Sequence, residues 1–131
     1  NLGTMIRTAD AAGIDAVILG KGTADLYNAK TLRSAQGSHF HIPVVRGELN
    51  DWVDRLQDDG ITVYGTALEH AVPFTEVKTN GTFALIVGNE GSGITPQILA
   101  KTDQNVIVPI KGQAESLNVA VATGILLYAF A

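Results

Sequence analysis

Apolar residues along this chain alternate between helical spacing and short unbroken runs. The spacing i, i+3, i+4, i+7 predicts one helix that Gly13 ends and another that Gly60 ends. This spacing is carried by Leu2, Met5, Ile6 and Ala9 in the first helix and by Leu49, Trp52, Val53 and Leu56 in the second. Two further helices are expected, one over residues 25–36 and one from about residue 116 to the end.

Five segments rich in apolar residues are predicted to be strands between these helices, and the unbroken apolar run at residues 16–19 is typical of a buried strand. The five segments cover residues 16–19, 40–45, 61–67, 83–87 and 106–108. Thr95 and Pro96 are residue types typical of an N-cap and a first helical position, so another helix is expected after the fourth strand. Strands that alternate with helices indicate an α/β fold with a mostly parallel sheet and helices on both faces.

The last predicted helix has no charged residue from Leu117 through Phe130. A helix that is apolar all round is buried, and about 14 residues are too few to span a bilayer. In so small a domain, burial on every side indicates a subunit interface. The sequence therefore predicts dimerisation and no membrane segment.

Composition narrows the class of protein further. The 131 residues are 46% hydrophobic and 17% charged, which supports one globular domain and excludes intrinsic disorder. The absence of cysteine excludes disulfides, thiol catalysis and cysteine-ligated zinc, and it is consistent with a reducing cytoplasm. The three histidines lack the spacing of a metal site, so no metal is expected; they are His39, His41 and His70.

Charge is distributed unevenly around a net value of −4. Residues 1–47 carry five basic and three acidic side chains, whereas residues 48–78 carry two basic and seven acidic ones. A polyanion such as RNA is therefore expected to contact the first third of the chain.

Three segments could carry chemistry. Residues 88–93 (GNEGSG) follow a strand, where glycines could either admit a ligand or simply turn the chain. Ser116 and Asn118 could cap the last helix or bind an anion at its start. Arg7 lies among the small residues Gly3, Thr4 and Ala11, so it is either a solvated charge or a group in a crevice shared with another helix.

Taken together, these segments resemble the SpoU/TrmH-type RNA ribose methyltransferases of the SPOUT superfamily. Residues 1–13, 84–94 and 108–122 are similar to the family's motifs 1, 2 and 3, and residues 30–37 and 43–44 match the pattern between them. The resemblance implies S-adenosylmethionine-dependent methyl transfer to a ribose 2′-hydroxyl, with rRNA preferred over tRNA. It also implies a C-terminal trefoil knot and a homodimer packed through the first and last helices.

The resemblance also implies roles for individual residues. The catalytic positions are Arg7, Glu90, Ser116 and Asn118. The methyl donor is expected at Thr66, Ala67, Gly88, Gly91, Val108, Ile110 and Leu117, and RNA at Asn1, Arg7 and Arg33. A strand before motif 1 and any N-terminal RNA-binding domain are missing, so residues 1–131 are expected to be a catalytic domain truncated at both ends. The alternative function is a degenerate SPOUT domain that binds RNA or dimerises without methylating.

Overall fold

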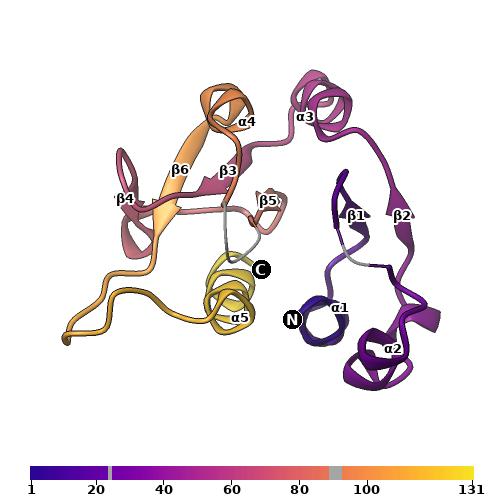
Figure 1. Cartoon of the computed structure of the whole chain (residues 1–131). Helices are drawn as coiled ribbons and strands as arrows, with labels where there is room; N and C mark the ends of the chain where they lie inside the picture. Colours follow the sequence, from indigo (N-terminus) through magenta and orange to yellow (C-terminus); the bar gives the residue numbers. More distant parts are fainter. Residues whose placement is uncertain (24, 89–92) are drawn as a thin grey trace.

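A computed structural model describes residues 1–23, 25–88 and 93–131. Its helices and strands alternate as the apolar pattern predicts (Figure 1). The helices are α1 (Leu2–Ala11), α2 (Ala29–Ala35), α3 (Leu49–Asp58), α4 (Pro96–Lys101) and α5 (Val119–Phe130), with 3-10 turns η1 (Ser38–Phe40) and η2 (Phe74–Glu76). The strands are β1 (Val17–Leu19), β2 (Val44–Arg46), β3 (Val63–Thr66), β4 (Val72–Pro73), β5 (Ala84–Ile86) and β6 (Gln104–Ile107).

The strands form two sheets in which every pair is parallel. β1 pairs with β2, and the other four are ordered β4-β6-β3-β5. Figure 1 shows α3 and α4 on one side of the strands and α1, α2 and α5 on the other. The α/β fold with helices on both faces is thus confirmed, although the described strands form two sheets and not the expected single one.

Helix α5 and strand β5 connect the two halves of the core. α5 contributes Leu127 to the apolar cluster beneath β1 and β2, and Leu126 and Phe130 to the cluster around β3 and β6. Phe83 packs against both clusters, and its ring meets that of Phe130 edge-on with centroids 5.6 Å apart. The prediction that α5 is buried holds for one face only, because Val121, Ile125 and Tyr128 are 54%, 37% and 61% exposed.

Two predicted elements begin later than the sequence suggested. The helix expected from residue 25 starts only at Ala29, because the Asp25 carboxylate accepts the Tyr27 N–H in a turn and Asn28 caps the helix. The strand expected from residue 40 starts only at Val44, because η1 occupies Ser38–Phe40. In both cases a local side-chain or turn contact replaces the start of the regular element.

Ser116 is not the cap of the last helix, which corrects the capping interpretation. Asn118 caps α5, its Oδ1 accepting the N–H groups of Ala120 at 2.8 Å and Val121 at 3.3 Å. The cap predicted at Thr95 is confirmed, with Pro96 at the first helical position. The two-residue strand β4 was not predicted, since it carries too little pattern to be recognised. No helix in the described ranges is long and apolar enough to cross a membrane.

The small residues of α1 do not all share one exposed face. Gly3 is buried against α2 of the same chain, where an added Cβ would collide with Thr31 and Ser34. Thr4, Arg7 and Ala11 are exposed. Gly3 therefore serves the packing of α1 on α2, and only the other positions remain for contact with a second molecule.

Candidate active site

The carboxyl ends of three parallel strands meet at one edge of the four-stranded sheet. Thr66 donates its hydroxyl to the Ile86 carbonyl at 3.3 Å, which joins the ends of β3 and β5. Ala67 donates its N–H to the Val106 carbonyl at 3.2 Å, which joins β3 to β6. In open α/β sheets this edge is where ligands bind.

Gly88, at the same edge shortly after β5, lies against Gly93 and Ile94. A Cβ on Gly88 would collide with the backbone of Gly93 and Ile94, so the close approach requires glycine. Val108 and Ile110 are half-buried, and Leu117 is 38% exposed. Glu90 and Gly91, which the sequence placed in the site, lie outside the described residues.

The starts of α1 and α5 come together although 117 positions separate them in sequence. Asn118 donates its Nδ2–H to Asn1 Oδ1 at 3.3 Å. The same helices pack along their length, with Thr123 Oγ1 3.6 Å from Met5 Sδ. Asn118 thus caps α5 through Oδ1 and also joins motif 3 to motif 1.

The remaining predicted residues are exposed on neighbouring elements. Arg7 lies on the solvent side of α1, Ser116 in the segment before α5, and Arg33 in the last turn of α2. Leu68, which the sequence reasoning missed, directly follows Ala67 and is 75% exposed. A single exposed apolar side chain is common on protein surfaces, so Leu68 does not by itself mark a ligand site.

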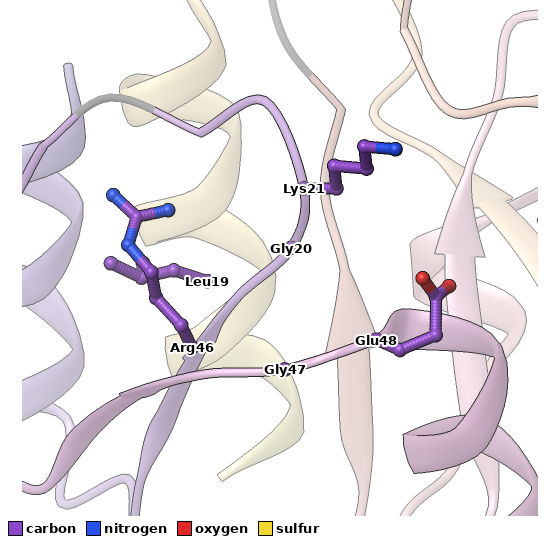
Figure 2. A pocket seen from close by; sticks show the side chains of 6 residues that line it. All are labelled: Leu19, Gly20, Lys21, Arg46, Gly47 and Glu48. Carbon is purple, nitrogen blue, oxygen red and sulfur yellow. The ribbon is translucent and has the colours of Figure 1, made fainter.

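An open cavity of about 320 Å³ lies at the carboxyl ends of β1 and β2 (Figure 2). Its glycines are explained by packing, because a Cβ on Gly20 would meet Leu49 and a Cβ on Gly47 would collide with Trp52. Figure 2 shows the Arg46 side chain directed away from those of Lys21 and Glu48. The charged groups therefore do not converge on one ligand position.

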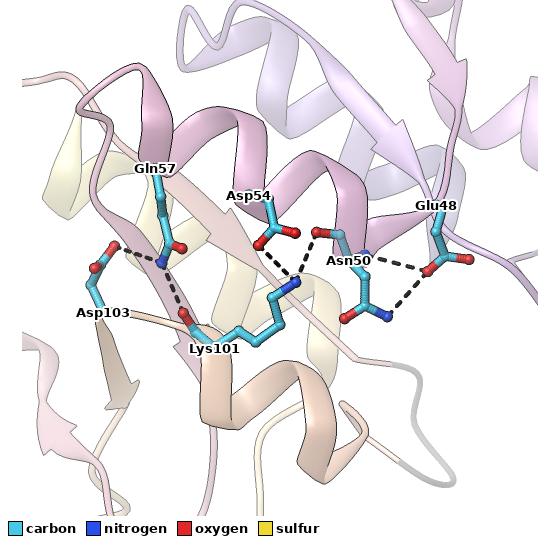
Figure 3. A network of polar contacts seen from close by, with 6 residues as sticks. All are labelled: Glu48, Asn50, Asp54, Gln57, Lys101 and Asp103. Carbon is cyan, nitrogen blue, oxygen red and sulfur yellow. Dashed lines mark hydrogen bonds and ion pairs between the residues drawn. The ribbon is translucent and has the colours of Figure 1, made fainter.

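Polar side chains hold α3 against α4, and the acidic residue that α3 contributes to this contact is Asp54 (Figure 3). Lys101 Nζ lies 2.8 Å from Asp54 Oδ1 and 3.0 Å from the Asn50 carbonyl. Gln57 Nε2 donates to the Lys101 carbonyl at 2.8 Å, and Asp103 Oδ2 accepts the Val63 N–H at 2.7 Å. These groups satisfy one another, so this network is structural.

The histidines give no sign of catalysis. His41 Nδ1 lies 3.1 Å from Asp10 Oδ2, and hydrogen bonds from His41 and Ser38 hold the pKa of Asp10 below its ordinary value of 3.8. No three potential metal-ligating side chains gather within the described ranges. The His41–Asp10 pair ties the end of α1 to η1.

The chain was compared with models of known protein families. The model of the SpoU rRNA Methylase family matches residues 1–128, nearly the whole chain. The chain belongs to this family. The close approach at Gly88 and the joined starts of α1 and α5 are therefore features of a SpoU-type domain.

Individual relatives agree with this assignment. The chain is 66% identical over 128 residues to the 23S rRNA (guanosine(2553)-2'-O)-methyltransferase RlmP of Bacillus subtilis, covering 98% of this chain and 52% of that protein. The AdoMet-bound rRNA methyltransferase from Sinorhizobium meliloti superposes with a TM-score of 0.91 at 36% identity, covering 98% of this chain and 49% of the other.

A third relative is the SpoU methyltransferase AviRb from Streptomyces viridochromogenes in complex with AdoMet. It superposes with a TM-score of 0.87 at 34% identity, covering 98% of this chain and 53% of the other. The SpoU-type chain described here therefore spans about half the length of the relatives it matches.

Proposed function

We propose that the full-length protein containing this chain methylates a ribose 2′-hydroxyl in rRNA with S-adenosylmethionine as donor. The observation that carries this proposal is the 66% identity to RlmP across 98% of the chain. The RlmP name specifies a guanosine in 23S rRNA, so we infer a guanosine of that RNA as the substrate nucleotide.

The cofactor is proposed to bind at the strand-end edge of β3, β5 and β6. The residues are Thr66, Ala67, Gly88, Val108, Ile110 and Leu117, with Gly91 as a further expected contact. They fit S-adenosylmethionine because backbone groups at the strand ends can bond the adenine edge, while half-buried Val108 and Ile110 supply apolar surface for its ring. When bound, the cofactor supplies a methyl group already activated on a sulfonium.

The protein has to position the ribose hydroxyl and to stabilise the negative charge that develops on its oxygen. Bound S-adenosylmethionine would supply the methyl group, and the protein would hold the ribose 2′-oxygen in line with it and leave a path for the hydroxyl proton to reach solvent. Arg7 is proposed to orient the ribose and its phosphate and to stabilise the developing alkoxide. A guanidinium has a pKa above about 12, which makes it a poor base.

The polar residues before α5 complete the proposed site. Asn118 is held by its cap bonds and by Asn1, so its position at the start of α5 is fixed. Ser116 is exposed nearby in the chain and is proposed to contact the ribose or a phosphate, as is Glu90. Arg33 is proposed to contact the RNA backbone on the same positive third of the chain.

A homodimer is proposed through the outer faces of α1 and α5. Val121, Ile125 and Tyr128 form an exposed apolar stripe on α5 at spacing i, i+4, i+7. α1 packs beside it, with Thr8 Cγ2 3.5 Å from the position of a Cβ on Gly124. Sedimentation of Ile125→Asp is expected to show monomers where the parent protein shows dimers.

Two features of the fold are proposed beyond the observed layers. The residues before Asn1 in the longer protein are proposed to add a strand between β1 and β5, because apolar side chains of both strands contact one core cluster while the described strands do not pair. The segment that ends in α5 is proposed to form the trefoil knot. The hydrogen bond from Thr79 Oγ1 to the Phe130 carbonyl is consistent with a tightly held C-terminus.

The function is tested with the full-length protein and labelled S-adenosylmethionine. Label is expected in rRNA and not in tRNA, and calorimetry is expected to show S-adenosylhomocysteine binding. Cofactor binding without transfer to any RNA would indicate a degenerate module instead. Binding of ATP or NAD without S-adenosylhomocysteine would refute the cofactor assignment.

A further inference from the structure

A second cavity, of about 240 Å³, lies between the start of α1 and the segment around the start of α2. It is lined by the polar side chains of Asn1, Asp25, Asn28, Lys30 and Ser34, beside the backbone of Gly3. None of its lining residues is aromatic. The lining therefore offers a carboxylate, an ammonium, amides and hydroxyls, but no ring on which a base could stack.

The two charged side chains that line this cavity can each form a further polar contact with a ligand. Asp25 uses Oδ1 to accept the Tyr27 N–H at 3.0 Å, which leaves Oδ2 without a hydrogen bond to any described residue. The Lys30 backbone N–H bonds Asn28 Oδ1 at 2.9 Å, whereas its ammonium forms no ion pair in the described part of the chain. One carboxylate residue and one lysine thus line the same small space.

The cavity adjoins the proposed methyl-transfer site without belonging to it. Asn1 lines the cavity and also accepts the hydrogen bond from Asn118. Arg7 lies one helical turn beyond Gly3 on the exposed side of α1, and helical side chains lean toward the N-terminus, where the cavity lies. None of the residues proposed to hold the cofactor lines this cavity.

We propose that this cavity binds the ribose–phosphate unit of the nucleotide next to the methylated one. Asp25 Oδ2 accepts a hydrogen bond from the 2′-hydroxyl of that neighbour, and Lys30 pairs with its phosphate. The inference rests on the proposed function only in taking RNA as the ligand.

Size and chemistry favour this occupant. Sites for whole small molecules commonly exceed about 300 Å³, so a space of about 240 Å³ fits one sugar–phosphate unit better than a complete nucleotide cofactor. The 2′-hydroxyl can donate to a carboxylate, which is the contact that distinguishes RNA from DNA. Lysine is a point-charge partner for phosphate.

The test for Asp25 uses the full-length protein and an rRNA fragment that contains the methylated nucleotide. Each neighbouring position in turn carries a single 2′-deoxy substitution, and affinity is measured by fluorescence anisotropy. At one position the deoxy substitution is expected to weaken parent binding by about 10- to 150-fold, as for loss of a hydrogen bond to a charged group.

Asp25→Asn keeps an oxygen for the Tyr27 N–H but replaces the free acceptor with a donor. This variant is expected to bind the unmodified RNA more weakly and to show no further loss at that deoxy position. Asp15→Asn, at an exposed position before β1, is the matched control and should retain the full deoxy penalty. An undiminished penalty in Asp25→Asn at every position would overturn the Asp25 contact.

Lys30→Gln tests the phosphate contact by the way in which RNA affinity depends on salt concentration. The slope of log affinity against log salt concentration is expected to fall by about one unit, whereas Lys78→Gln, on the exposed loop after η2, should leave it unchanged. Equal slopes in the two variants would overturn the phosphate contact. Because both readouts measure binding, they still report on the cavity if methyl transfer is absent, and that absence would refute the proposed function alone.

Discussion

The polar side chains between α3 and α4 differ from those on the exposed faces of α1 and α2. Between α3 and α4, Asp54, Lys101 and Gln57 bond to each other or to backbone, and their charges and dipoles are satisfied. Around the other helices, Arg7 and Arg33 are exposed on the positive third of the chain. The more acidic segment thus builds the scaffold, while the residues suited to RNA are those the scaffold leaves to solvent.

Removing Arg7 should produce the largest functional change. Arg7→Ala is expected to lower methyl transfer by about 100- to 1,000-fold, since a group that stabilises transition-state charge is lost. S-adenosylhomocysteine affinity by calorimetry should stay nearly constant. Arg55→Ala is the control from α3, where the guanidinium lies 4.5 Å from the centre of the Trp52 ring, and it should retain turnover. Normal turnover in Arg7→Ala would show that its assigned role is wrong.

Gly88→Ala should lower both the stability of the protein and its affinity for the cofactor, because the added methyl group has no space. The added Cβ collides with the backbone of Gly93 and Ile94, which is expected to cost about 1–3 kcal/mol of folding free energy. S-adenosylhomocysteine affinity should fall by about tenfold, equivalent to about 1.4 kcal/mol. Gly112→Ala is the matched control because its Cβ meets nothing within 4 Å. Equal melting temperatures and affinities in the two variants would contradict the close approach.

Asp103→Ala should change stability without changing the chemistry. The Val63 N–H loses its acceptor in a residue that is fully buried, at a cost of about 1–3 kcal/mol. Denaturant unfolding should show this loss, whereas Asp58→Ala, at the exposed end of α3, should not. Turnover per folded molecule is expected to stay at the parent value. A drop in turnover at unchanged stability would show that Asp103 acts in the active site and not in the packing of α3 on α4.

The smallest effect is expected at the Asp10–His41 pair. Because the folded pKa of Asp10 is lowered, the carboxylate contributes stability above about its ordinary value of 3.8, and this contribution disappears as pH falls through the lower folded value. Asp10→Asn should therefore be slightly less stable than the parent near neutral pH and converge with it in acid. A stability difference that persisted unchanged into acid would contradict the pairing.

Local signals in the sequence predicted most of the fold. Thr95 followed by Pro96 marked the start of α4, and the apolar runs located five of the six strands. The choice between Ser116 and Asn118 as cap could not be made from sequence, because both are good capping residues and the helix begins only at Val119.

The parts of the site that could not be predicted from the sequence depend on contacts between residues far apart in the chain. The cavity that joins Asp25 and Lys30 to Asn1 depends on the packing of α1 on α2, which no local pattern encodes. The Lys101–Asp54 pair likewise joins positions 47 residues apart. The contact that requires glycine at position 88 lies only five residues away, but the sequence left open whether the glycines of residues 88–93 admit a ligand or turn the chain.

The most direct test is to locate the methyl group in rRNA after reaction with the full-length protein. The RNA is incubated with S-adenosylmethionine, and resistance to alkaline cleavage is then mapped nucleotide by nucleotide. One new resistant guanosine in 23S rRNA, absent with Arg7→Ala, is the predicted result. Methyl groups found only on bases, or no methylation of rRNA at all, would contradict the proposal that this protein is a ribose 2′-O-methyltransferase.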